Sequence, residues 1–124
     1  MSAMSTASRK DKGRRLQQWV CKKIAELTGF EWGHDKPIES RGMGQCGVDV
    51  RLESCVLEKF PFSVECKNQE SWAVHNWIKQ AQENQVQGTD WLLVAKRNHN
   101  KPVVILDAEV FFKLLDKGDN KNNG

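Results

Sequence analysis

The chain has 124 residues, 39% of them hydrophobic and 28% charged, which is the composition of a single globular domain. No apolar run approaches the roughly 20 residues that a membrane-spanning helix needs, so we expect no membrane span. The net charge is +3, yet residues 1–23 carry seven cations against one anion. This basic leading segment fits either a polyanionic partner or a solubilising tail, and charge alone leaves both interpretations open.

The four cysteines stand singly along the chain, at positions 21, 46, 55 and 66. The sequence has no CxxC pair and no histidine at finger-like spacing, which argues against a zinc site. Free thiols are the default in a reducing cytoplasm, and we expect the protein there. The first fifteen residues are basic but have no apolar segment behind them, so they do not form a secretory signal.

The first predicted element is an amphipathic helix. Residues 1–9 are small, polar and basic and are expected to form a disordered tail. From about residue 10 to residue 28 the apolar positions recur at the spacing of one helix face, and Gly29 is a natural stop. The positions on that face are Leu16, Trp19, Val20, Ile24 and Leu27.

Two strands are predicted next. Residues 30–47 are rich in glycine and are typical of a loop, with a short strand near residues 36–39. Residues 48–53, VDVRLE, alternate between apolar and polar side chains, as a half-buried strand does. Residues 54–59 are expected to be a turn into a second strand at residues 60–68, and the two strands to pair as an antiparallel hairpin.

The second half of the chain predicts a helix, two strands and a helix. Residues 71–87 show helical spacing, with Ser71 as a plausible N-cap. Residues 91–96 and 102–106 are continuous apolar runs of the interior-strand type. Asp107 is expected to cap a short helix, and residues 117–124 to form a polar tail. We therefore predict one α/β domain over residues 10–116, with a central mixed sheet of about five strands and helices on both faces.

The strand at residues 60–68, FPFSVECKN, has an apolar face and a charged face. Successive side chains of a strand point to opposite faces, so Glu65 and Lys67 lie side by side. Asp49 lies on the polar face of the preceding strand and would converge on the same place. Two close carboxylates repel each other unless a cation lies between them, and oxygen ligands suit Mg²⁺ or Mn²⁺. A surface ion pair is the alternative that Glu65 and Lys67 alone would support.

The combination of these motifs is more specific than any one of them. Asp49 followed by Glu65-Cys66-Lys67 resembles the D…(D/E)-x-K core of the PD-(D/E)XK nuclease superfamily. The predicted order of elements is similar to its restriction-endonuclease-like core, and the resemblance covers roughly residues 10–115. Within the superfamily, K-G-R-R on the first helix, the glycine-rich loop and E-C-K-N resemble small phage-encoded nucleases, which are similar to archaeal-type Holliday junction resolvases.

The resemblance implies a role for each residue of the motif. Asp49 and Glu65 would be metal ligands, and the backbone carbonyl of Cys66 would be a third ligand. Lys67 would position or activate the attacking water. The side chain of Cys66 should point into the core and take no part in the chemistry.

The chain departs from the pattern of the superfamily at two positions. Val48 replaces the proline that precedes the aspartate in the superfamily's name. Gln17 stands where resolvase-like members carry a glutamate on the first helix. Gln17 would then contact the metal through water, or Glu26 or Glu39 would supply the charge, with Glu39 favoured, or the site would be weaker. Gln80, on the helix after the motif, is a further candidate, with a solvated face as the alternative.

Phosphate contacts come from Lys, Arg, polar side chains and backbone amides. The sequence contains no base-reading motif, so we expect recognition by shape and backbone. Trp72 is a candidate for stacking on a base, with core packing as the alternative. The candidate DNA-binding residues are Arg9, Lys10, Lys12, Arg14, Arg15, Ser40, Arg41, Asn68, Ser71 and Trp72.

The resemblance implies a Mg²⁺-dependent endodeoxyribonuclease, with Mn²⁺ as a substitute, that acts on branched DNA such as a Holliday junction. Two paired cuts across such a junction predict a two-fold homodimer, in the host cytoplasm if the protein is phage-encoded. Two alternatives remain open. One is a broader flap, mismatch or single-strand endonuclease, and the other is a DNA-binding module whose nuclease site has decayed, which Gln17 suggests.

Overall fold

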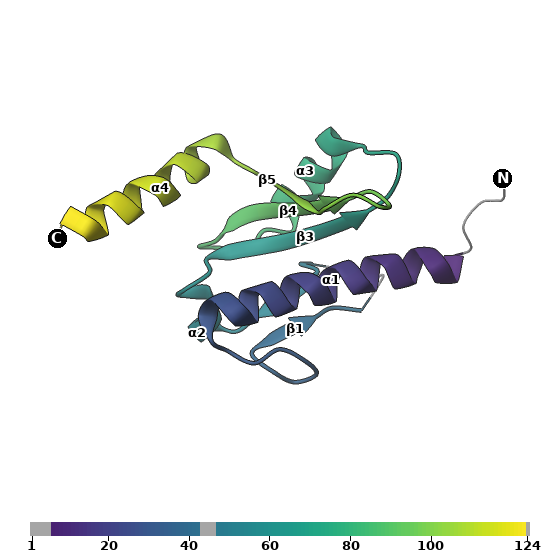
Figure 1. Ribbon diagram of the computed structural model, residues 1–124, viewed down its shortest axis with the longest axis horizontal. Coiled ribbons are helices and arrows are strands. Elements are labelled where there is room, and N and C mark those ends of the chain that lie inside the picture. Colours follow the sequence, from purple (N-terminus) through teal and green to yellow (C-terminus); the bar gives the residue numbers. More distant parts are fainter. Residues whose placement is uncertain (1–5, 43–46, 124) are drawn as a thin grey trace.

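The computed structural model describes residues 6–42 and 47–123 (Figure 1). Within these residues, no helix is both long enough and apolar enough to cross a membrane. The elements run in the order α1 (Thr6–Thr28), β1 (Ile38–Ser40), β2 (Val50–Leu52), α2 (Ser54–Leu57), β3 (Phe62–Asn68), α3 (Val74–Glu83), β4 (Asp90–Lys96), β5 (Val103–Leu106) and α4 (Ala108–Asn123).

The strands form two sheets rather than the single sheet of about five strands that was expected. β1 and β2 pair antiparallel, whereas β3, β4 and β5 form a second sheet in that order. β3 and β4 run parallel with α3 as their crossover, and β4 and β5 run antiparallel. The mixed α/β class is confirmed. The division into two sheets leaves β3 at the edge of the larger one.

The prediction that residues 48–53 and 60–68 pair as an antiparallel hairpin is wrong. β2 pairs with β1 instead, and the expected turn contains the short helix α2, which carries the chain away before β3 begins. One hydrogen bond still ties the two segments together, because the backbone N–H of Asp49 donates to the carbonyl of Val64 at 3.0 Å. Asp49, the residue just before β2, therefore lies against β3.

One face of the larger sheet is covered by α1 (Figure 1). Leu16, Val20 and Ile24 are buried there with Val64 and Val94, and they form the main core. Two residues expected on this helix face are not buried, because Trp19 is 43% exposed and Leu27 is 71% exposed. Gln17 and Cys21 are buried in their place, so the buried stripe is rotated toward them.

The opposite face is covered by α3, so helices on both faces are confirmed. Trp77 and Ala81 of α3 pack on Leu93 and Ala95, which alternate along β4 with the residues that face α1. The predicted N-cap at Ser71 is wrong, because α3 begins later. Its N-cap position is Ala73, which has no side chain that can cap the helix.

The last helix, α4, extends away from the rest of the molecule (Figure 1). Asp107 caps it as predicted, since its Oδ1 accepts a hydrogen bond from the N–H of Glu109 at 2.9 Å. α4 continues through residues 117–123 and α1 includes residues 6–9, although both segments were expected to be tails. The division of the chain into a domain and two tails stays a prediction.

Candidate active site

Asp49 and Glu65 are brought together by two hydrogen bonds between their chain segments. Asp49 Oδ2 accepts from the backbone N–H of Cys66 at 2.7 Å, and the Asp49 N–H donates to the Val64 carbonyl at 3.0 Å. These two partners are the residues on either side of Glu65. The side chains of Glu65 and Lys67 lie on the same face of β3, and Lys67 Nζ is 3.8 Å from Glu65 Oε2. The structure thus places the three predicted catalytic residues in one cluster.

Burial and mutual repulsion perturb both carboxyl groups. The pKa of Glu65 is raised to about 7, chiefly by burial and then by the negative charge of Asp49. The pKa of Asp49 is also raised by burial, although the N–H of Cys66 and the charge of Lys67 oppose the rise. A strongly perturbed pair of carboxyls beside a single amine is typical of functional sites. If both carboxyls ionise, their charge exceeds that of the one lysine beside them.

This donor set fits a hard divalent cation. Ionised carboxylate oxygens are the ligands that Mg²⁺ and Mn²⁺ prefer, and a cation between them would remove the repulsion that raises the pKa of Glu65. Burial raises the pKa of the Cys66 thiol well above its ordinary value, so this group does not form the thiolate that a soft metal would need. A site built on oxygen is the chemistry that these residues support.

Residues 8–123 match the model of a protein family described as phage putative PDDEXK endonuclease. The chain belongs to this family. Searches of curated proteins and of solved structures found no match. Membership confirms the resemblance to phage nucleases of the PD-(D/E)XK type, which are typically dependent on a divalent metal.

A residue of the endonuclease that was not predicted from the sequence, Asn84, touches Glu65. Its Nδ2 donates to Glu65 Oε1 at 3.3 Å from the C-cap position of α3. The helix was expected to continue to residue 87, which hid this role, although asparagine is a poor residue for a helix interior and favours caps. Gln80 lies one turn earlier and is exposed, and the described residues show no hydrogen bond between it and Glu65.

Two of the candidates for the role of the missing helix carboxylate lie apart from each other. Gln17 contacts Ser40, and Glu39 contacts Arg51. Gln17 is 3% exposed, and its Oε1 accepts a hydrogen bond from Ser40 Oγ at 2.8 Å. The next residue, Arg41, donates its N–H to the Asp49 carbonyl at 2.8 Å. Gln17 therefore reaches the segment that carries Asp49. Glu39 instead pairs with Arg51 at 3.0 Å, on the other face of β1.

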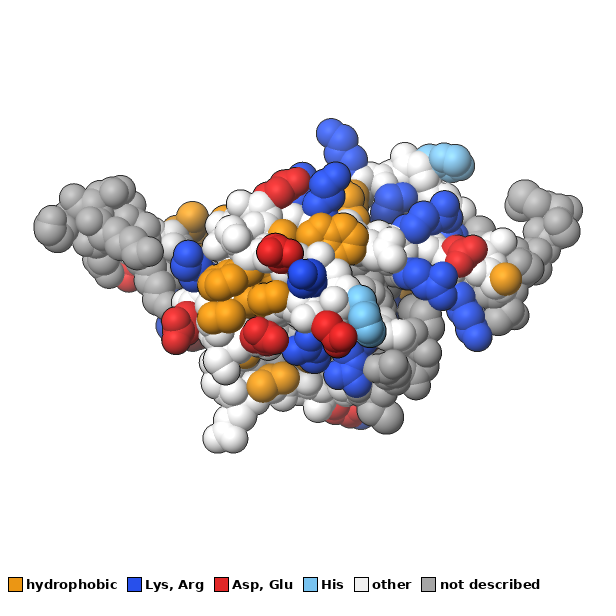
Figure 2. Space-filling view, turned by 90° about the horizontal axis from the view of Figure 1, so that it is seen from below, with side chains coloured by type: hydrophobic (Ala, Val, Ile, Leu, Met, Phe, Trp, Pro, Cys, Tyr) orange, Lys and Arg blue, Asp and Glu red, His pale blue; other side chains and the backbone are white. Residues whose placement is uncertain are grey.

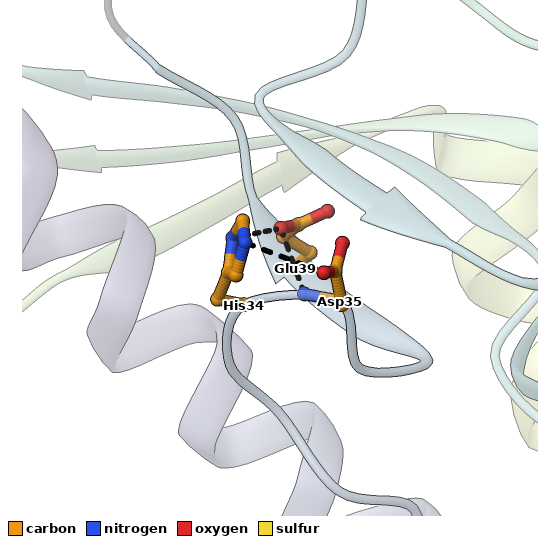
Figure 3. Close-up of side chains that lie close together, drawn as sticks. All are labelled: His34, Asp35 and Glu39. Carbon is orange, nitrogen blue, oxygen red and sulfur yellow. Dashed lines mark hydrogen bonds and ion pairs between the residues drawn. The ribbon is translucent and has the colours of Figure 1, made fainter.

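The described residues contain one His and carboxylate cluster with metal-like spacing, formed by His34, Asp35 and Glu39 (Figure 3). Its geometry is that of ion pairs. His34 Nε2 faces Asp35 Oδ2 and His34 Nδ1 faces Glu39 Oε2, both at 3.3 Å, so the two carboxylates take different ring nitrogens. Glu39 is also held by Arg51 and by the backbone N–H of Asp35. The side chains of His34 and Asp35 are 90% and 85% exposed, and this cluster gives no support to a second metal centre.

Most of the predicted DNA-binding residues line two hollows beside the site. One hollow, of about 550 Å³, includes Lys67 and five of the predicted contacts, which are Arg9, Lys10, Lys12, Asn68 and Ser71. A smaller one, of about 230 Å³, includes Arg14, Ser40 and Arg41, and the loop residues 43–46 beyond it lie outside the described residues. Figure 2 shows Lys and Arg side chains gathered toward the end of the molecule where α1 begins.

Trp72 has contacts that favour packing over stacking on a base. Its ring lies 6.0 Å from that of Trp77, between ring centroids, and its Nε1 donates to the Gln69 carbonyl at 2.8 Å. Trp72 is half-buried and packs against the smaller core cluster. Its DNA contact stays a prediction that these contacts do not favour.

Proposed function

We propose that this endonuclease hydrolyses phosphodiester bonds in branched DNA, such as a four-way junction, and that it uses Mg²⁺ or Mn²⁺ as its metal cofactor. The proposal rests on the Asp49–Glu65 pair, which lies beside Lys67 and a basic hollow. Hydrogen bonds from Asp49 to Val64 and from Cys66 to Asp49 hold this pair together. The choice of branched DNA is supported by the resemblance of the motifs to junction resolvases. A surface with many cations and no base-reading element suits recognition of DNA shape.

Each residue of the cluster has a task in this reaction. Asp49 and Glu65 would hold the metal with the Cys66 carbonyl, and the metal would stabilise the charge of the phosphoryl transition state. Glu65 is oriented by Asn84, and Asp49 is oriented by the N–H of Cys66. Lys67, whose side chain is 19% exposed, opens on the basic hollow, where its ammonium would bind a phosphate oxygen or orient the attacking water.

We further propose that the active form is a two-fold dimer, because a junction needs two symmetrical cuts. Exposed apolar side chains on α4 support this assembly. Phe111 is 45% exposed and Phe112 is 65% exposed, on a helix that packs little against the rest of its own chain. A helix of this kind gains stability from a partner.

The test is a cleavage assay on four-way junction, flap, duplex and single-stranded DNA, with Mg²⁺, with Mn²⁺ and with EDTA. We expect cuts in the junction that need a divalent ion and that disappear in Asp49→Asn and Lys67→Ala. Lys79→Ala, at an exposed position of α3, is the matched control and should cut as the unchanged chain does. Undiminished cleavage by both active-site variants would refute the proposal, and a preference for flaps or single strands would replace the junction as substrate.

A DNA-binding module with a decayed nuclease site is the second candidate, and Gln17 is the observation that favours it. A neutral amide is a weaker ligand for a hard cation than a carboxylate. This candidate predicts junction binding that persists in Mn²⁺ without products. Any metal-dependent product that Asp49→Asn abolishes would exclude it.

A further inference from the structure

Lys12 is a largely buried residue whose ammonium has no partner among the residues that the structure describes. Its relative exposure is 9%, yet within residues 6–42 and 47–123 its ammonium makes no hydrogen bond or ion pair. Elsewhere on α1, Arg14 is paired with Asp11 and Lys23 is paired with Glu26. Lysine often buries its aliphatic stem and keeps its ammonium accessible. Lys12 lines two hollows, so its ammonium is available to an anion that enters them.

Lys12 and Asn68 together separate two hollows. Both residues line the hollow of about 550 Å³ that contains Lys67, and both line a second hollow of about 710 Å³. Asn68 Nδ2 donates to the Lys12 carbonyl at 3.3 Å, whereas Asn68 Oδ1 is buried and accepts no hydrogen bond from the described residues. A ligand that crosses this partition from the catalytic hollow would meet a free ammonium and a free acceptor. It would then enter the second hollow.

The second hollow, which we call the α1 hollow, combines cations with an exposed aromatic ring. The cations Arg15 and Lys96 are in its wall, and the one carboxylate among its described lining residues, that of Asp11, is paired with Arg14. Trp19 is 43% exposed and also lines it. A positively charged groove with an aromatic stacking surface is how proteins bind single-stranded nucleic acid.

We propose that the α1 hollow binds an unpaired DNA strand next to the cut, with a phosphate on Lys12 and a base stacked on Trp19. The inference deepens the proposed function and rests on it in taking DNA as the ligand. Bases within a duplex are already stacked on their neighbours and are not free to stack on Trp19. The hollow would therefore favour substrates in which a strand leaves the duplex near the cut, as it does at a flap or an opened junction.

The test measures binding in EDTA, so that it does not depend on cleavage. Fluorescently labelled oligothymidylate and a duplex of equal length are titrated against the unchanged chain, Trp19→Ala and Lys12→Met. We expect Trp19→Ala to weaken binding of the single strand about tenfold and to change duplex binding much less. Lys12→Met should weaken binding and lower the salt slope for the single strand by about 0.7. Leu27→Ala and Lys79→Met, which change exposed residues outside the hollow, are the matched controls.

Lys12→Met should keep the fold, because methionine has nearly the length of lysine and fills the space of its buried stem. Thermal melting of both variants checks this. Equal losses on single strand and duplex in Trp19→Ala, or an unchanged salt slope in Lys12→Met, would overturn the inference. A chain that cuts junctions but shows no Trp19 effect refutes this inference alone. A chain that binds single strands through Trp19 and Lys12 but never cuts supports it and refutes the proposed nuclease function.

Discussion

Glu65→Gln should inactivate the enzyme and at the same time stabilise the metal-free fold. The glutamine keeps the shape of the side chain and an oxygen that can still accept from Asn84. It removes a carboxylate that is 3% exposed and that lies against the negative charge of Asp49. A buried charge that is poorly compensated costs stability, so its removal should be favourable until a metal is added.

The size of this effect follows from the pKa of Glu65, which is about 7 in the folded protein against an ordinary value of 4.5. Because the folded pKa is the higher one, the contribution of Glu65 to stability is fully present below pH 4.5 and is lost as the pH rises through 7. At about 1.4 kcal/mol for each pKa unit, ionised Glu65 costs about 3 kcal/mol at pH 8 and about 1 kcal/mol at pH 5. The stability gained by Glu65→Gln should grow between these two pH values.

The assay is urea denaturation in EDTA at pH 5 and pH 8, followed by tryptophan fluorescence. Glu26→Gln is the matched control, because Glu26 is an exposed residue of α1 with a single ion pair to Lys23. We expect the control to change stability little at either pH. Saturating Mn²⁺ should stabilise the unchanged chain and should stabilise Glu65→Gln much less. A variant that is less stable at pH 8, or whose gain is the same at both pH values, would refute the electrostatic reasoning.

Three further predictions concern the same site and the core behind it. A carboxyl must lose its proton before it binds a metal, and the pKa of Glu65 is about 7. Mn²⁺ binding measured by calorimetry should therefore be about tenfold tighter at pH 8 than at pH 6, and equal affinities would contradict this. Gln17→Glu should tighten Mn²⁺ binding and lower stability in EDTA, because it adds a buried carboxylate behind Ser40; unchanged metal affinity would place Gln17 outside the site. Trp77→Ala should cost about 3–5 kcal/mol in urea denaturation, because Trp77 is 6% exposed against Leu93; a loss below about 1 kcal/mol would contradict the packing.

Local hydrophobic patterns predicted much of this fold. The continuous apolar run at residues 91–96 became β4, which is buried between α1 and α3. The alternation in FPFSVECKN placed Val64 in the core and Glu65 with Lys67 on the other face. Such patterns succeed because burial on a given face is a property of the segment itself, set by the period of its side chains.

Pairing between segments was predicted less well, because it depends on contacts that are distant in sequence. The connection between β2 and β3 was expected to be a turn but contains the helix α2. The hairpin ladder is therefore replaced by one backbone hydrogen bond, from Asp49 to Val64, and by the hydrogen bond that the Asp49 side chain accepts from Cys66. Glu39 was favoured as a metal ligand, but its sequence position does not show which face of the strand its side chain occupies. β1 places Ser40 toward Gln17 and leaves Glu39 with Arg51.

The missing ladder has a consequence for the site itself. Asp49 lies just outside β2, and two hydrogen bonds, one to Val64 and one from Cys66, hold it against β3. The repulsion between Asp49 and Glu65 opposes this contact as long as both are ionised, whereas a cation between them would reinforce it. Metal binding should therefore order the junction of the two sheets as well as complete the site. The charge that destabilises the free protein is then the same charge that couples its folding to the metal.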